Sequence, residues 1–230
     1  MTAMDVIRDA AASVLVGEDE QRVELVVRPG LPAERIDELS SKFGVRLPGE
    51  LQDLLPECSG LDGLLADIDF SGQRGDLQGL ETLFPRGIPV AQDGFGNSWL
   101  LDASAERAEA IHVFFACHDP PVILYQAPSL AAFLAEVVKM YRPPHKSLVD
   151  DVHEDRVFEV WRTNPGTLTV AQAATGDQVL RDFAARLDEA FTVVDLRAAE
   201  VGMGFSWGRH GPRTRLRRHA EARVFAYGPP

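Results

Sequence analysis

The spacing of apolar side chains predicts four helices in the first 141 residues of the chain. In each of them apolar residues recur three or four positions apart, as they do along one face of an α-helix. Pro32 and Pro48 suit the first turn of a helix, Gly44 suits the residue that ends one, and Ser129 is a good N-cap. The predicted helices cover Ala3–Leu15, Pro32–Gly44, Pro48 to about Ser59–Gly60, and Ser129–Tyr141.

Short apolar runs between these helices predict strands. In Ala66–Phe70 apolar and acidic residues alternate, which predicts a half-buried strand with Asp67 and Asp69 on its outward face. The glycine-rich segment Asp93–Asn97 predicts a tight turn between two strands. The predicted strands are Val23–Val27, Ala66–Phe70, Ile88–Ala91, Trp99–Leu101, Ile111–Ala116 and Val122–Tyr125.

A break at Arg142–Lys146, which contains two prolines, predicts a domain boundary. We therefore expect a first domain over residues 1–144 and a small α+β module over residues 145–230. The helices predicted in this module are Val149–Trp161 and Gln178–Leu187, and its strands are Phe191–Asp195, Met203–Trp207 and Arg223–Tyr227.

The net charge of −12 is unevenly distributed. Residues 1–144 hold 11 basic and 23 acidic residues, whereas residues 145–230 hold 12 of each. Excess acidity in the first domain would repel a phosphate backbone and would attract and steer a basic protein, such as a nuclease. The alternative is that the charge only maintains solubility.

Several features favour a cytoplasmic protein. No apolar run approaches the ~18 residues of a membrane span, and the N-terminus carries Asp5 and Asp9 where a signal peptide would be basic. The two cysteines, Cys58 and Cys117, form no Cys-x-x-Cys motif and fit a reducing compartment.

Residues capable of chemistry do not form a catalytic set. Cys117, His118 and Asp119 are adjacent on a predicted strand, so their side chains alternate between faces and cannot act together. His112 and His118 could share a face, but two histidines alone are more often structural than metal-binding. Neither Gly94–Gly96 nor Gly202–Gly208 leads into a helix, as a dinucleotide-binding loop must. We therefore expect no enzyme activity, no cofactor and no metal.

The segment Arg209–Arg218 contains five arginines and could contact nucleic acid. It lies in a segment that is neutral overall, between two predicted strands. A solvated hairpin, or a basic patch that docks on the acidic first domain, explains it better.

A set of acidic residues on the predicted strands and loops is our candidate for partner binding. The alternative is a solvated face with aspartates that serve turns. The candidate residues are Asp62, Asp67, Asp69, Asp76, Asp93 and Asp119.

The order of these features resembles the SUKH superfamily, which includes fungal regulators of cell-wall synthesis and many bacterial immunity proteins. The resemblance covers about residues 30–141. Cys58-Ser-Gly60 stands where the third helix of the family usually ends in Asn-Gly-Gly. The segments that carry the resemblance are Ile36–Pro48, Leu51–Gly60, Ile88–Asn97, Leu101–Asp102, Val113–Phe115, His118–Asp119 and Ala127–Leu134.

The resemblance implies an α+β fold, with a twisted, mostly antiparallel sheet and flanking helices, and a protein-binding role without catalytic residues. Two functions follow. The first is a bacterial immunity protein that neutralises a toxin, often a nuclease, by binding its basic catalytic domain. The second is a regulatory scaffold for a housekeeping partner in cell-wall or growth control. The module after residue 145 would extend the binding surface or cover an edge strand of the first domain.

Overall fold

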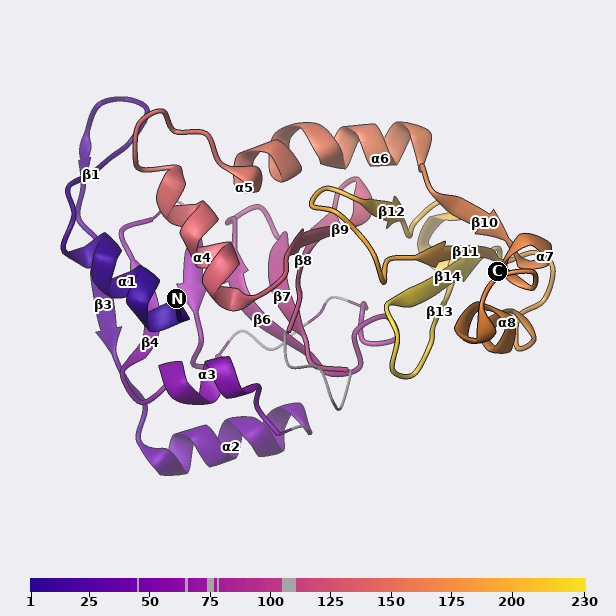
Figure 1. Ribbon diagram of the computed structural model, residues 1–230, viewed down its shortest axis with the longest axis horizontal. Coiled ribbons are helices and arrows are strands. Elements are labelled where there is room, and N and C mark those ends of the chain that lie inside the picture. Colours follow the sequence, from indigo (N-terminus) through magenta and orange to yellow (C-terminus); the bar gives the residue numbers. More distant parts are fainter. Residues whose placement is uncertain (45, 65, 74–76, 78, 105–110) are drawn as a thin grey trace.

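An eight-stranded antiparallel sheet forms the centre of the molecule in the computed structural model, which describes residues 1–44, 46–64, 66–73, 77, 79–104 and 111–230 (Figure 1). Its strand order is β12-β9-β8-β7-β6-β5-β4-β3. The strands are β3 (Val26–Pro29), β4 (Cys58–Asp62), β5 (Asp67–Asp69), β6 (Gly87–Gln92), β7 (Ser98–Asp102), β8 (Val113–His118), β9 (Pro121–Ala127) and β12 (Gly204–Ser206).

The central strands are buried on both faces, which explains why their sequences are apolar throughout. Neighbouring residues of a strand point to opposite faces. Phe115 therefore packs with Trp99 beneath the helices, whereas Phe114 packs with Phe84 and Phe225 on the other face.

Helices cover one face of this sheet. Ser129 caps α4 by accepting a hydrogen bond from the Ala132 amide (3.0 Å), and the Glu50 carboxylate accepts from the amides of Leu130 and Ala131 (3.0 and 2.8 Å). A carboxylate at this position also complements the helix dipole. The helices of this layer are α1 (Ala3–Ala11), α2 (Ala33–Phe43), α3 (Gly49–Leu54), α4 (Leu130–Lys139), α5 (Leu148–Asp150), a π-helical segment (Asp151–Arg156) and α6 (Val157–Thr163).

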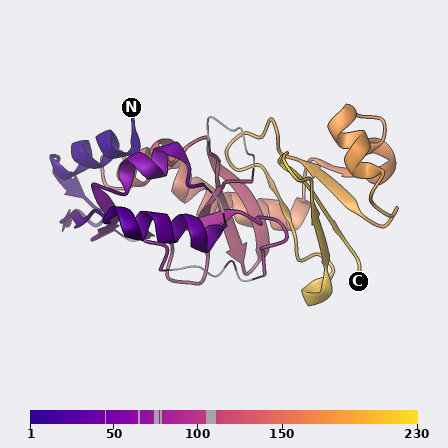
Figure 2. The ribbon, with the colours of Figure 1, turned by 90° about the horizontal axis from the view of Figure 1, so that it is seen from below.

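A second, four-stranded sheet covers the other face. Its order is β10-β11-β14-β13, and Phe225 and Tyr227 of β14 pack with Phe205 of β12. Helices α7 (Val170–Ala173) and α8 (Gln178–Ala184) cover its far side, away from the N-terminal helices (Figure 2). The strands are β10 (Thr167–Thr169), β11 (Thr192–Asp195), β13 (Arg215–Arg218) and β14 (Val224–Gly228), and a 3-10 turn covers Gly211–Arg213.

Apolar side chains from both sides of the predicted domain boundary at residues 144/145 pack together. The boundary itself stays a prediction. Val149, Val152, Val157 and Val160 belong to one core with apolar residues of the segment 1–144. Strand β12 pairs with β9 and so covers what would otherwise be an edge of the large sheet.

The α+β class and the mostly antiparallel sheet are confirmed, whereas several element boundaries were wrong, three of them within the first 62 residues. The first helix ends at Ala11, and the strand predicted at 23–27 is split between β2 (Arg22–Val23) and β3. The third helix ends at Leu54, so Cys58–Gly60 lies in β4. There the Arg28 guanidinium passes so close to Gly60 that a Cβ at this residue would lie 2.1 Å from it. Within the described residues, no helix is both long and apolar enough to cross a membrane.

Candidate functional site

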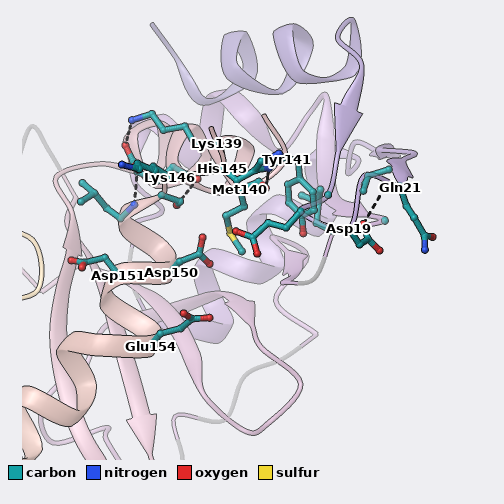
Figure 3. Close-up of a pocket in the computed structure, with 18 of the residues that line it drawn as sticks. Asp19, Gln21, Lys139, Met140, Tyr141, His145, Lys146, Asp150, Asp151 and Glu154 are labelled. Carbon is teal, nitrogen blue, oxygen red and sulfur yellow. Dashed lines mark hydrogen bonds and ion pairs between the residues drawn. The ribbon is translucent and has the colours of Figure 1, made fainter. Parts of the chain in front are cut away.

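A groove of about 1320 Å³ lies between the β1–β2 hairpin and the segment that connects α4 to α5 (Figure 3). Strand β1 (Leu15–Val16) and strand β2 (Arg22–Val23) form one wall with their connecting loop. The C-terminal end of α4 and the first turns after Ser147 form the other wall. The groove therefore draws on both sides of the predicted domain boundary.

Backbone hydrogen bonds fix the hairpin wall. The Val16 amide donates to the Tyr141 carbonyl (2.9 Å), which ties the hairpin to the end of α4. Within the loop the Gly17 amide donates to the Gln21 carbonyl (2.8 Å), and Asp19 Oδ1 accepts from the Gln21 amide (3.1 Å). These contacts close the loop that carries Glu18.

Glu136 and Ser147 fix the opposite wall. Ser147 is the N-cap of α5, and its hydroxyl donates to the Glu136 carbonyl (2.8 Å). The Glu136 carboxylate in turn accepts from the Leu148 amide (2.9 Å). This reciprocal arrangement determines the direction in which the helix after Ser147 leaves α4, and so it places the acidic residues that follow.

The groove is strongly acidic. Among the described residues, its lining holds eight acidic and three basic side chains, which is a formal charge of −5. The acidic residues are Glu18, Asp19, Glu24, Glu136, Asp150, Asp151, Glu154 and Asp155, and the basic ones are Arg22, Lys139 and Lys146.

Three carboxylates from the two walls face a common space. Asp150 and Glu154 lie one helical turn apart and point to the same side, toward Met140 and Tyr141 (Figure 3). Burial raises the pKa of Asp150, and the charges of Glu154 and Glu18 raise it further, which outweighs an opposing contribution from His153. Like charges are thus close enough to interact across the groove.

The structure gathers three of the predicted partner-binding residues around Arg28. Its guanidinium nitrogens lie 3.5 Å from Asp62 Oδ1, 4.0 Å from Asp67 Oδ1 and 3.5 Å from Asp69 Oδ1. The expectation that Asp69 faces outward was wrong, since its side chain is 5% exposed and accepts hydrogen bonds from Ser71. A role for these residues in partner binding stays a prediction.

The other predicted residues lie elsewhere. Asp93 organises the β6–β7 turn by accepting from the Phe95 amide (2.8 Å) and the Asn97 side chain (2.6 Å), and its Oδ2 lies 2.9 Å from His153 Nε2. Burial acts to raise the pKa of Asp93, but these hydrogen bonds outweigh burial and lower it. Asp119 is exposed in the β8–β9 turn, and Asp76 lies outside the described residues.

The remaining candidates for chemistry have structural partners. Burial raises the pKa of the Cys117 thiol to about 11, which leaves almost no nucleophilic thiolate at neutral pH. His118 Nδ1 lies 2.9 Å from Asn97 Oδ1, and His112 Nδ1 lies 3.0 Å from the Tyr125 hydroxyl. Within the described part of the chain, no three His, Cys, Asp or Glu side chains are grouped so that they could hold a metal ion.

Several arginines of the basic segment also contact the protein itself. The Arg218 side chain is 3% exposed and forms an ion pair with Asp102 of β7 (2.6 Å), so this part of the segment contacts residues 1–144. Arg215 pairs with Asp188 (3.0 Å), and Arg209 donates to the Trp161 carbonyl.

The carboxylates of the groove were missed at the sequence level. Asp150, Asp151, Glu154 and Asp155 have the spacing of one helical face, which is a signal that the sequence does carry. The sequence does not show that the hairpin bearing Glu18 lies opposite them.

Comparison with known proteins gives one match. The model of the SMI1 / KNR4 family (SUKH-1) matches residues 30–136. No curated protein and no solved structure matches the chain. The matched part begins after the hairpin and ends within α4, so both flanking segments lie outside it.

Proposed function

Because residues 30–136 belong to the SUKH superfamily, we propose that this chain is a non-catalytic immunity protein that acts in the cytoplasm. Proteins of this superfamily bind partner proteins. The partner proposed for this chain is the basic catalytic domain of a cognate toxin, such as a nuclease. Binding would block the toxin's active site or its access to substrate.

The acidic groove carries this proposal. A formal charge of −5 on one concave surface attracts a basic protein and repels a phosphate backbone. Electrostatic complementarity of this kind raises association rates and selects among partners. It also favours a protein partner over nucleic acid as the direct ligand.

Neutralisation of a toxin is the direct test. The chain is co-expressed with the toxin encoded by the adjacent gene, and survival of the cells is measured with and without it. We expect survival only in its presence, together with a complex that can be isolated. Survival that does not depend on the chain would refute the immunity function.

The association rate gives a second measure of the same proposal. Raising ionic strength from low salt to about 0.5 M should slow association markedly, because the Debye length falls to a few ångströms. A rate that is independent of salt would argue against steering by the acidic surface. A growth or envelope defect on deletion, without any toxin, would instead support the regulatory scaffold.

A further inference from the structure

The walls of the acidic groove come almost entirely from segments outside the part that matches the family. Of the lining residues that the structure describes, only Gly63, Leu64 and Glu136 fall within residues 30–136. The hairpin wall precedes that part, and the wall that carries Asp150 follows it. A shared fold that carries its binding site on added segments is a common way for related proteins to acquire different ligands.

The size of the groove indicates the kind of occupant. Small-molecule pockets usually enclose roughly 300–1,000 Å³, and this groove of about 1320 Å³ exceeds that range. It also contains apolar surface from Met140 and Leu148, of which Leu148 is 42% exposed. A polypeptide segment with long side chains suits such a mixed surface.

Three carboxylates of the groove have no cation of their own within the part of the chain that the structure describes. Among the described residues, none donates a hydrogen bond to the side chain of Glu18, Asp150 or Glu154, and none forms an ion pair with them. Asp150 is half-buried, so its charge is desolvated without compensation from a partner. A cation placed between the two walls would relieve the repulsion among all three.

We propose, on the basis of the partner-binding function above, that the groove binds a segment of the partner rich in Lys or Arg and determines which partner this chain accepts. A basic side chain of that segment lies between Glu18 on the hairpin and Asp150 and Glu154 on the opposite wall. Its aliphatic stem packs on Met140 and Leu148, since Lys and Arg bury their methylene groups while the charged end stays polar.

A peptide binding assay tests this assignment on the full chain. The probe is a short fluorescent peptide of alternating Arg and Ser, and its affinity is measured by anisotropy at low salt. The groove variant is Glu18→Gln/Asp150→Asn/Glu154→Gln. Because loss of one exposed ion pair weakens an interaction by roughly 1.4- to 5-fold, we expect this variant, which loses three, to bind about tenfold more weakly.

A matched variant separates the groove from net charge. Asp37→Asn/Asp53→Asn/Glu189→Gln also removes three acidic groups, all of them exposed and outside the groove. We expect it to bind the peptide within about twofold of the unmodified chain, because distant exposed charges are screened. Equal weakening by both variants would overturn the proposal, because net charge alone would then explain binding.

The thermal stability of the groove variant provides a check on folding. Removal of three mutually repelling charges should leave the melting temperature unchanged or raise it, so weaker binding cannot be attributed to unfolding.

The toxin assay distinguishes the two proposals. If the groove variant neutralises the toxin as well as the unmodified chain does, the immunity function stands and the groove assignment fails. If the peptide binds selectively in the groove but no toxin is neutralised, the groove assignment stands and the immunity function fails.

Discussion

The buried ion pair between Arg218 and Asp102 joins the two sheets, and its loss should destabilise the whole protein. Both side chains are 3% exposed, and the nitrogen and oxygen lie 2.6 Å apart. Arg218 also donates to the Leu83 carbonyl (2.7 Å) and lies over the Phe225 ring (5.0 Å). Substitution Arg218→Met keeps most of the apolar stem and removes the charge, so that Asp102 is left buried without its cation.

The magnitude follows from the burial of both groups. Removal of one partner from a buried pair costs about 3–5 kcal/mol, because the remaining charge stays desolvated. A chain of this size loses roughly 2–4 °C in melting temperature for each kcal/mol. We therefore expect a decrease of roughly 6–20 °C for Arg218→Met.

Urea and thermal unfolding followed by circular dichroism measure this effect. The control is Arg35→Met, which removes the ion pair between Arg35 and Glu38. These two side chains are 51% and 60% exposed, so the substitution should lower the free energy of unfolding by less than about 0.5 kcal/mol. The double variant Arg218→Met/Asp102→Leu removes both buried charges and should recover much of the loss. A loss below about 1 kcal/mol for Arg218→Met would refute the reasoning.

Two further predictions concern pH and strand packing. Burial, reinforced by the charge of Arg223, lowers the pKa of His112 to about 4, so the unfolded chain binds the proton first as pH falls through 6.5. The free energy of unfolding should therefore decrease as the pH falls from 6.5 toward 4. Allowing for partial solvent exposure of the imidazole, we expect the free energy of unfolding measured in urea to fall by about 1–2 kcal/mol between pH 7 and pH 5. This decrease should be absent in His112→Gln if the imidazole is responsible. At Gly204 a Cβ would lie 1.9 Å from the Ile123 carbonyl oxygen, so Gly204→Ala should displace β12 and cost about 1–3 kcal/mol in thermal unfolding. Gly49→Ala, where a Cβ meets no atom within 4 Å, should not lower the melting temperature, and equal effects at both glycines would contradict this account.

Local pattern was sufficient for most elements because the interactions that form them are local. Gly44 adopts the left-handed conformation (φ 62°) that ends α2, and Ser129 caps α4, as their positions in the sequence predict. Element ends were less predictable where a distant group decides them. The strand at Cys58–Asp62 depends on pairing with β3 and on Arg28, which passes over Gly60 from another strand.

The apolar faces of the helices, the buried strands and the excess of acidic residues can be predicted from the sequence, since each depends on composition or on neighbours a few positions apart. Where those charges meet depends on the fold. It gathers Asp62, Asp67 and Asp69 around the single cation of Arg28, buries Asp102 against Arg218, and places Glu18 opposite Asp150 across the groove. The physical reason is that Coulomb interactions and desolvation depend on distance and burial in space, and the chain brings these groups together from segments that are far apart in sequence.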